Sequence, residues 1–261
     1  MKRLVTLLGV AALGLLIPLS SPASAAERHL FFVNCPPSQV LADDPIVHRG
    51  VAGASHEHQF FGNLNTNAFS TYESMIAAPT TCVFPPDTAG YWVPTAYDDG
   101  IRVVPRQINA YYRPTTSTRS PDQAFPADFR MVAGGSIRAA YWTCGASTTR
   151  SITIRDCGSK LVRANVVFPA CWNGIKDPAN DTANVTYSIS RGCPSTHPIA
   201  LPRLTVVVVY PFTNGTGVTL ASGPPETLHG DFWNTWQQTV LEGKVQECLQ
   251  VGVSPTCGKL A

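Results

Sequence analysis

Two histidines that are two positions apart, His56 and His58, form the residue pair with the clearest chemical potential in the chain. If the segment 55–62 is extended, side chains at this spacing point to the same face, about 7 Å apart along the backbone. Glu57 then points to the opposite face. Two converging imidazoles can bind a metal ion, or they can divide the work of a general acid and a general base.

A second polar segment, 229–234, lies far along the chain and contains His229 and Asp231. We expect the two segments to meet in the fold, so that His56, His58, His229 and Asp231 point into one pocket. These four residues are the candidate catalytic groups, and the three histidines are candidate ligands of a divalent metal ion. The alternative for each is a structural role, in which the histidines only hydrogen bond to loop carbonyls.

The elements that must position these residues are expected to be β-strands. Short runs of β-branched and aromatic residues alternate with Gly, Pro and Asn turns, which is typical of an all-β protein with a single-domain β-sandwich or jelly-roll-like fold. Residues 205–209 are apolar on both faces and predict a central strand. Strands are expected at 31–35, 91–97, 101–104, 107–113, 129–133, 137–144, 151–154, 161–168, 185–189, 204–210 and 218–221.

Two helices are expected beside the strands. A Ser-x-x-Glu pattern of the capping-box type predicts a short helix near 70–78. Apolar residues that recur at helical spacing predict a C-terminal helix near 231–249. Asp231 is expected to cap the N-terminus of that helix, with His229 just before it.

The first 26 residues have the features of a secretory signal peptide. A basic start, Met1–Arg3, precedes an apolar run and an Ala-x-Ala end, and such a segment is removed on export. No later apolar run is long enough to span a bilayer. We therefore expect 27–261 to form one secreted, β-rich domain, located outside the cell.

Charge gives little reason to expect a nucleic-acid or membrane partner. The chain has 19 basic and 17 acidic residues, and loss of Lys2 and Arg3 makes the two numbers equal. Such a balance provides no electrostatic attraction to polyanions. Charged residues are 14% of the chain, against about 25% in typical proteins. A surface rich in hydroxyl and amide groups suits a neutral partner such as a glycan.

The eight cysteines all follow the signal segment, and an even number in an oxidising compartment indicates four disulfides. Eight cysteines allow 105 pairings, so the sequence does not determine the connectivity. We favour pairs that are local in sequence. They are Cys144–Cys157, Cys171–Cys193 and Cys248–Cys257, which leaves Cys35–Cys82.

Seven short motifs occur in a fixed order along the chain. They are His56-x-His58-x-Phe60-Phe61-Gly62, Thr80-Thr81-Cys82, Tyr91-Trp92-x-Pro94, Tyr111-Tyr112-Arg113, Phe168-Pro169-x-Cys171-Trp172-x-Gly174, Cys193-Pro194-x-x-His197-Pro198 and His229-Gly230-Asp231-Phe232-x-Asn234-x-Trp236. In these motifs the chain resembles the family of domains of unknown function numbered nineteen-ninety-six (DUF1996). The resemblance extends from about Asp44 to Cys248.

The resemblance implies an exported protein, because members of that family are exported proteins of fungi and bacteria. Some of them carry a WSC carbohydrate-binding module, which implies a glycan context by association and names no reaction. The chain departs from the family after Trp172. Where members commonly have Asp-Gly and then Ser-His, this chain has Asn173-Gly174 and then Ala183-Asn184. The departure leaves the four candidates named above and His197 as the residues that could carry a reaction.

Aromatic and polar residues near the motifs are candidates for substrate binding. An outward tyrosine beside Arg113 could form the floor of a sugar cleft by stacking against the ring. The candidate substrate-binding residues are Trp92, Tyr111, Tyr112, Arg113 and Asn234. Most aromatic residues in the chain are nevertheless expected to belong to the core.

Three functions remain open from the sequence. The first is a secreted enzyme acting on cell-wall or other extracellular polysaccharide through a His/Asp pocket, as a hydrolase or lyase. The second is a non-catalytic glycan-binding wall protein. The third is a copper- or zinc-binding protein that uses the histidines. A serine hydrolase, a P-loop enzyme and a dinucleotide-binding enzyme are disfavoured, because the chain contains none of their motifs.

Overall fold

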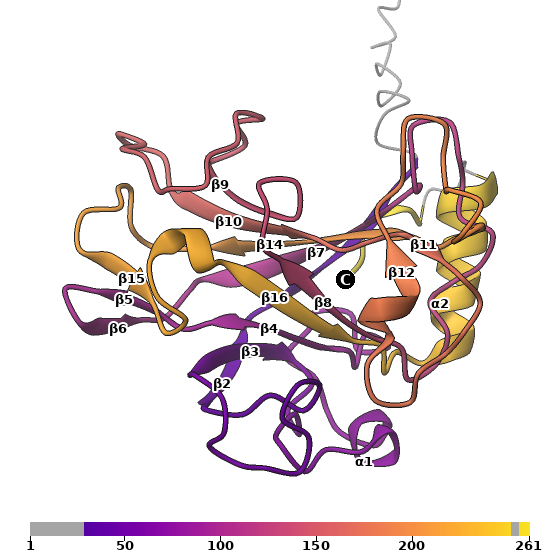
Figure 1. Ribbon diagram of the computed structural model, residues 1–261, viewed down its shortest axis with the longest axis horizontal. Helices are drawn as coiled ribbons and strands as arrows, with labels where there is room; N and C mark the ends of the chain where they lie inside the picture. Colours follow the sequence, from indigo (N-terminus) through magenta and orange to yellow (C-terminus); the bar gives the residue numbers. More distant parts are fainter. Residues whose placement is uncertain (1–28, 252–255) are drawn as a thin grey trace, which may run out of the picture.

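The computed structural model describes residues 29–251 and 256–261. Two large β-sheets pack face to face in this part of the chain, as Figure 1 shows. Sheet A has six strands, and every neighbouring pair is antiparallel except β17 and β1. Its strands, in spatial order, are β17 (Gly258–Lys259), β1 (Phe31–Cys35), β7 (Gln107–Arg113), β14 (Arg203–Val209), β10 (Val162–Val167) and β9 (Ala140–Cys144).

Sheet B has five strands, all antiparallel to their neighbours. In spatial order they are β2 (Pro37–Leu41), β3 (His58–Gly62), β4 (Gly90–Pro94), β16 (His229–Trp233) and β8 (Arg130–Gly134). Two small sheets extend the ends of the molecule. They are formed by β12 (Val185–Thr186), β11 (Cys171–Trp172) and β13 (Ile199–Ala200), and by β15 (Val218–Leu220), β5 (Ala96–Asp98) and β6 (Ile101–Val103). The expected all-β, sandwich-like fold is confirmed.

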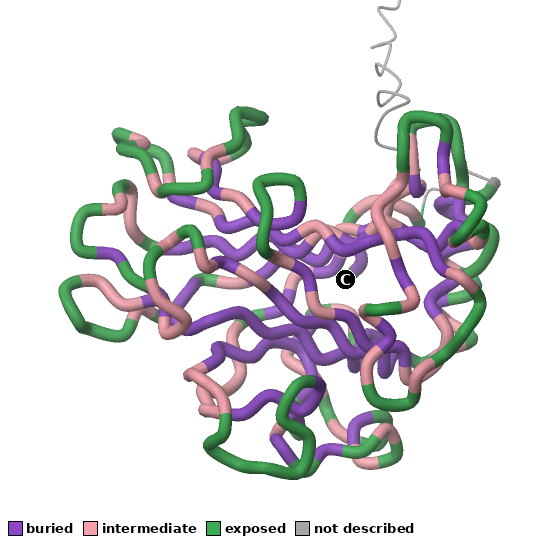
Figure 2. The backbone as a smooth tube through the Cα atoms, in the orientation of Figure 1, coloured by how far each residue is buried: buried purple, intermediate pink, exposed green. Residues whose placement is uncertain are grey.

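The main core lies between the inner faces of sheets A and B. In β7, Ile108, Ala110 and Tyr112 are fully buried, because alternate side chains of a strand point to the same face. Tyr112 and Tyr91 of β4 join the sheets through a 2.7 Å hydrogen bond between their hydroxyls. Figure 2 shows the buried backbone concentrated in the strands of both sheets. Each large apolar side chain buried in this layer contributes about 1.5–3 kcal/mol to stability.

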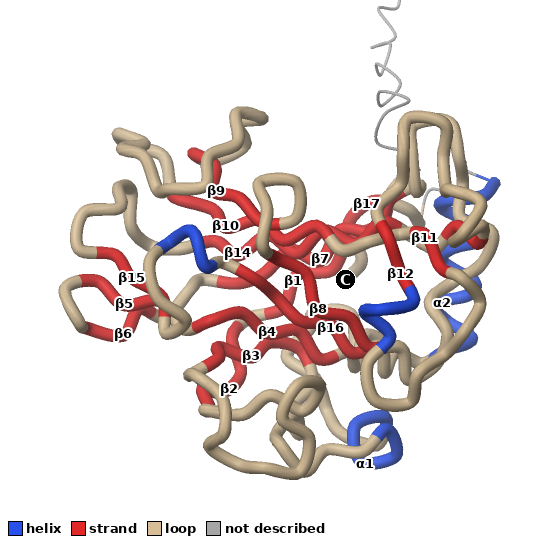
Figure 3. The backbone as a smooth tube through the Cα atoms, viewed as in Figure 1, coloured by secondary structure: helices blue, strands red, loops and turns tan. Residues whose placement is uncertain are grey.

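A second, smaller core covers the outer face of sheet B. Phe60, Trp92 and Trp233 belong to three adjacent strands and pack with Ile46 and Met75. The loop after β2 and the short helix α1 supply the cover, and Figure 3 shows both on the side of β2 and β3 away from sheet A. This layer makes the outer face of sheet B a buried environment, which matters for the polar groups beside it.

Helix α1 (Tyr72–Ile76) corresponds to the short helix expected near 70–78. Its N-cap is Thr71, whose side chain accepts a hydrogen bond from the Ser74 backbone. The capping box therefore uses Thr71 and Ser74, one residue later than the Ser-x-x-Glu pattern indicated. Short polar side chains at both positions make the two registers equivalent at the sequence level.

The C-terminal helix begins later than we expected. Residues 229–233 form β16, a strand inside sheet B, and helix α2 covers only Gln238–Val245. A π-helical segment, Gln246–Val251, extends α2. Asp231 therefore lies in a strand and caps no helix. Both faces of β16 are buried, so its side chains do not alternate between apolar and polar, and the run resembles a helical pattern.

Most of the other expected strands are present, several with shifted ends, but the strand expected at 91–97 is divided into β4 and β5, which belong to different sheets, and one strand is missing. β7 has the expected limits, and the expected central strand 205–209 lies within β14, between β7 and β10. Residues 151–154 form no strand, and only Ser151 makes an isolated bridge, to Trp142. Short Ser/Thr-rich segments satisfy their backbone groups with their own side chains, which competes with strand pairing.

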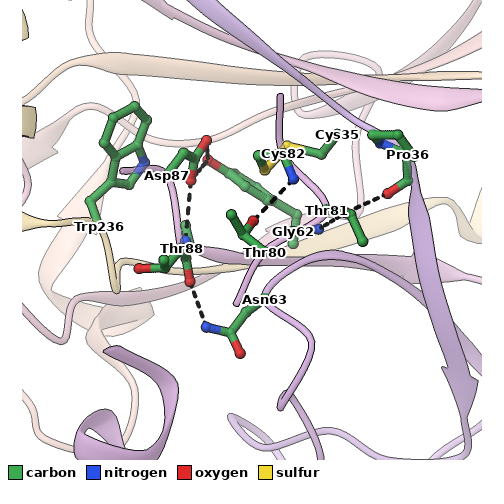
Figure 4. The surroundings of a disulfide bond; sticks show 12 residues. Cys35, Pro36, Gly62, Asn63, Thr80, Thr81, Cys82, Asp87, Thr88 and Trp236 are labelled. Carbon is green, nitrogen blue, oxygen red and sulfur yellow. Dashed lines mark hydrogen bonds between the residues drawn. A yellow bond between two sulfur atoms is a disulfide. The ribbon is translucent and has the colours of Figure 1, made fainter. Parts of the chain in front are cut away.

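All four disulfides have the pairings that we favoured. They are Cys35–Cys82, Cys144–Cys157, Cys171–Cys193 and Cys248–Cys257, and no described cysteine is free. Figure 4 shows the first of these, which ties the end of β1 to the loop before β4. Beside it, the Thr81 hydroxyl donates to the Pro36 carbonyl at 2.7 Å and accepts from the Gly62 backbone at 3.0 Å. The disulfide thus ties β1 of sheet A to the loop that leads into β4 of sheet B.

Among the described residues, no helix is long and apolar enough to cross a membrane. The expected signal peptide, residues 1–26, lies outside the described part of the chain.

Candidate functional site

Three histidine rings meet at one end of sheet B. The ring centres of His56 and His58 are 4.3 Å apart, those of His56 and His229 are 5.0 Å apart, and those of His58 and His229 are 5.7 Å apart. One nitrogen from each ring lies within 4.8 Å of the others. We refer to His56, His58 and His229 as the histidine cluster. The structure thus brings together two segments that are far apart in sequence.

The antiparallel pairing of sheet B explains the convergence. β4 lies between β3 and β16, and its residue Trp92 pairs with Phe60 on one side and with Asp231 on the other. The side chain of His58 points to the same face of the sheet as that of Phe60, two residues away. The side chain of His229 likewise points to the same face as that of Asp231. His56, just before β3, continues this spacing. The outer face of sheet B therefore collects side chains from both segments at the end where β3 and β16 begin.

Hydrogen bonds to backbone carbonyls fix two of the rings. Nδ1 of His58 lies 2.9 Å from the Asp43 carbonyl, and Nδ1 of His229 lies 2.9 Å from the Thr227 carbonyl. A carbonyl oxygen only accepts, so Nδ1 carries the proton in each ring and donates it. The lone pair of each neutral ring is then on Nε2. Nε2 of His58 and Nε2 of His56 are both buried, and neither has a hydrogen-bond partner among the described residues.

Two carboxylates border the histidine cluster. Asp231 is 1% exposed, and neither of its oxygens has a hydrogen-bond partner in the described structure. Asp44 is also buried, and one oxygen from each of these residues and one nitrogen of His58 lie within 4.8 Å of one another. Burial of an unpaired carboxylate raises the free energy of the folded state by roughly several kcal/mol. Asp231 must therefore be protonated or face a cation.

Burial is the largest cause of the pKa shifts of the three histidines and of the neighbouring Asp231. It lowers the pKa of His58 to about 3, with a further lowering by the neighbouring His56. It also lowers the pKa of His56 and of His229. Burial raises the pKa of Asp231 well above its usual range, and the charge of Asp44 raises it further. At neutral pH the cluster therefore offers three uncharged imidazoles and a protonated Asp231.

Asp43 and Asp44 form a polar turn that holds the cover over the cluster. Oδ1 of Asp44 accepts from the backbones of Ile46 and Val47, both at 2.9 Å. Asp43 accepts from the backbones of Gly53 and Ala68 at 2.9 and 3.0 Å. Asp44 is a residue of the site that the sequence motifs did not predict. An Asp-Asp-Pro turn in a chain with few charged residues was the available signal.

Glu57 points away from the cluster, as its position between the two histidines indicated. Its carboxylate pairs with Arg102 at 2.6 Å and accepts a hydrogen bond from the Tyr97 hydroxyl. His197 lies in a separate turn, where its Nδ1 contacts the Thr196 hydroxyl at 3.0 Å. Neither Glu57 nor His197 belongs to the cluster.

Three of the five residues considered for substrate binding are buried. Trp92, Tyr112 and Asn234 are 1%, 0% and 0% exposed. Tyr112 bonds to Tyr91 and Trp236, and the Asn234 amide donates to two carbonyls of the segment 125–126. These side chains therefore pack in the core, and their burial gives no support to the predicted role in substrate binding, which stays a prediction.

The other two, Tyr111 and Arg113, lie on the outer face of sheet A. The histidine cluster lies on the outer face of sheet B, so the structure does not bring these residues to the histidines. Phe32 stacks on the Tyr111 ring at 4.8 Å, and the Arg113 guanidinium lies 4.4 Å from the ring centre. The ring is therefore covered by Phe32 and approached by the Arg113 guanidinium, and Arg113 is itself partly buried.

The two positions at which the chain departs from the family pattern face each other. The Asn173 amide donates to the Asn184 side-chain oxygen at 3.0 Å. Asn173 follows β11 and Asn184 precedes β12, in a small sheet separate from sheet B. The replaced pair is thus self-contained, and its hydrogen bond does not involve the histidine cluster.

Comparison with known proteins gives one result. The model of a family described as Domain of unknown function (DUF1996) matches residues 44–236, which include the histidine cluster, Asp44 and Asp231. No curated protein and no solved structure matches the chain.

Proposed function

The chain belongs to the DUF1996 family, and from its side-chain geometry we propose that this protein is an exported metal-binding protein. The ion is a divalent transition metal, zinc or copper, bound by His56, His58 and His229. The four disulfides support a location outside the cell, because disulfides persist in oxidising compartments.

One observation carries the proposal: one ring nitrogen from each of the three histidines lies within 4.8 Å of the others, and Nδ1 of two of these rings is held by a backbone carbonyl. Metal-ligating histidines characteristically donate their other N–H to a carbonyl or carboxylate, which fixes the tautomer and the ring orientation. Neutral rings are also the form that a metal requires, and the lowered pKa values of all three histidines keep them neutral.

Asp231 and Asp44 support a bound cation by their charge. Asp44 and Asp231 are two buried carboxyl groups that lie beside each other. Neither forms an ion pair with a basic residue in the described part of the chain. A divalent ion would favour ionisation of Asp231 and compensate the charge of both groups. Asp231 is close enough to His58 to serve as a further ligand.

The donor set selects the kind of metal. Imidazole nitrogen suits zinc and copper, whereas magnesium and calcium prefer sites made of oxygen ligands. Three histidines with a fourth position open to water form the protein part of one type of catalytic zinc site. As whole residues His56 and His229 are only partly buried, although Nε2 of His56 is itself buried. When bound, such an ion supplies Lewis acidity and lowers the pKa of a coordinated water.

A second candidate function uses the same residues without a metal. Asp231 holds a proton and the histidines are neutral, so the cluster contains a proton donor beside proton acceptors, as a hydrolase or lyase of polysaccharide needs. The burial of Asp231 and His58 supports this candidate less than the first, because a sugar ring must reach both groups. A non-catalytic glycan-binding role draws no support from the cluster itself.

Metal analysis of protein purified without a histidine tag tests the proposal. The native protein should retain a stoichiometric amount of zinc or copper after dialysis against metal-depleted buffer containing no chelator. It should also rebind the ion after chelator treatment, with a rise in melting temperature. Protein that binds neither ion after refilling, yet releases new reducing ends or unsaturated sugars from a polysaccharide panel, would replace the first candidate with the second.

A further inference from the structure

A shallow hollow of about 370 Å³ lies on the outer face of sheet A, opposite the histidine cluster. Four adjacent strands, β7, β14, β10 and β9, form its floor, and the loop after β9 forms one wall. The face is available because alternate residues of these strands point away from the core. In β10, for example, Ala164 points into the core and Arg163 points to the hollow.

Four arginines surround the hollow, and no acidic residue lines it. They are Arg113, Arg150, Arg163 and Arg203. None of the four makes an ion pair or a side-chain hydrogen bond within the described residues, and Nε of Arg163 is buried without a partner. Other arginines of the chain do have such partners, as in Arg119–Asp122 and Arg130–Asp128. Four guanidiniums without such partners are thus gathered at this face.

Two of these arginines oppose each other directly. Arg113 of β7 and Arg203 of β14 are cross-strand partners, and like charges at such positions destabilise a sheet. Both pKa values are lowered by burial, and that of Arg113 is lowered further by the charge of Arg203. The fold thus tolerates a repulsive pair that no described acidic group relieves. An anion bound between the two guanidiniums would relieve it.

Aromatic rings orient two of the guanidiniums. The Arg113 guanidinium lies 4.4 Å from the Tyr111 ring centre, and that of Arg150 lies 4.3 Å from the Tyr141 ring centre. Stacking on a ring occupies the flat face of a guanidinium and leaves its N–H groups along the edge free to donate. Such edges match carboxylates and related oxyanions, which they bind with two parallel hydrogen bonds.

We propose that this hollow binds an acidic polysaccharide, that is, a sugar chain carrying carboxylate or sulfate groups. The arginines bind the charged groups, and the side chains of Thr205 and Asn165, which also line the hollow, face the sugar hydroxyls. A nucleic acid fits less well. The Tyr111 ring is covered on one side by Phe32 and approached by Arg113, which leaves little aromatic surface for base stacking. The formal net charge of the whole chain is only +2.

The double variant Arg163→Gln/Arg203→Gln tests the site, with Arg106→Gln/Arg138→Gln as the matched control. The control removes the same charge from exposed positions outside the hollow. Binding of polygalacturonate, dextran sulfate, neutral dextran and single-stranded DNA is measured by calorimetry at low salt, on protein with intact disulfides. Near-native melting temperatures show that each variant is folded.

We expect native protein to bind polygalacturonate or dextran sulfate and not neutral dextran. The preferred polymer identifies the charged group as carboxylate or sulfate. The hollow variant should bind about tenfold or more weakly, as expected for loss of charge-assisted hydrogen bonds, while the control retains affinity. Equal weakening by the control, unchanged binding by the hollow variant, or equal binding of DNA would overturn the proposal. The variant His58→Ala should bind the polymer normally, so failure here is independent of the metal site.

Discussion

Gly134 of β8 and His229 of β16 are direct cross-strand partners, and a Cβ added at Gly134 would lie 2.6 Å from the Cβ of His229. Such a separation is far below van der Waals contact, so any side chain at position 134 must displace the histidine. The glycine therefore sets where one member of the histidine cluster lies.

The variant Gly134→Ala should accordingly weaken metal binding. Metal–ligand distances are kept within about 0.2 Å of their preferred values, and the clash requires a larger shift of His229. We expect an increase in the dissociation constant of about tenfold or more, measured by competition with a chromophoric chelator. Gly243→Ala in helix α2 is the control, because its added Cβ meets no atom within 4 Å. Native affinity in Gly134→Ala would show that His229 is not a ligand.

Replacement of His58 by alanine should abolish retention of zinc or copper while the protein stays folded. The change removes a central ligand and leaves the Asp43 carbonyl without its donor, at a cost of about 1–3 kcal/mol. Metal content by mass spectrometry and melting temperature are measured on the same sample. His197→Ala, in a turn outside the cluster, should keep its metal. If His58→Ala loses stability and keeps the ion, the histidine has only a structural role.

The variant Asp231→Asn removes the negative charge that Asp231 can carry and keeps the shape of its carboxyl group. An amide resembles the protonated carboxyl that burial favours, so the metal-free variant should melt within a few degrees of the native protein. The variant cannot supply a negative charge to a bound cation, and we expect its metal affinity to fall about tenfold or more. Chelator competition gives the affinity, and calorimetry of metal-free protein gives the melting temperature. A large loss of metal-free stability would indicate that Asp231 is ionised in the native state.

Asp87 should make stability depend on pH through a buried network between the sheets. Its oxygens accept from the Tyr91 hydroxyl at 3.0 and 3.2 Å and from the Ala89 backbone, and Figure 4 shows the carboxylate near Trp236. Burial raises its pKa from 3.8 to about 8, against a smaller lowering by these hydrogen bonds. Between these values the unfolded chain loses a proton that the folded chain keeps.

Stability of the native protein should therefore fall as the pH rises from about 4 to about 8, by up to roughly 1.4 kcal/mol per unit from this group, and change no further above that range. Asp87→Asn keeps the shape of the protonated carboxyl and should lack this part of the pH dependence. Denaturant unfolding of both proteins at several pH values measures the difference. Parallel curves for the two proteins would contradict a protonated Asp87.

Features that depend on local residue types were predictable from the sequence. Hairpin turns and β-branched runs gave most strands, and short sequence separations favoured three of the disulfides, with Cys35–Cys82 left by elimination. The spacing of His56 and His58 indicated a shared face, and their rings are in contact. The proximity of His229 was an expectation based on residue chemistry, and sheet pairing around β4 provides it.

Features that depend on long-range pairing were not predictable. β16 is covered on both faces, so its sequence does not show the alternation that would distinguish it from a helix. Asp44 and the Asp43 carbonyl reach the cluster through a turn whose path no local pattern specifies. The hollow lined by arginines could be predicted only by knowing which strands are adjacent, because Arg113, Arg163 and Arg203 lie on three different strands of sheet A.

The strand order of sheet A has a consequence for how fast the protein folds. In its centre, Ala110 of β7 pairs with Val33 of β1 on one side and with Val206 of β14 on the other, so the sheet joins segments from early, middle and late parts of the chain. Contacts between such distant segments require closure of long loops, and proteins dominated by them fold slowly. β9 and β10 form a more local pair, next to the Cys144–Cys157 bridge. We therefore expect this pair to form early and the β1–β7–β14 pairing to limit the folding rate.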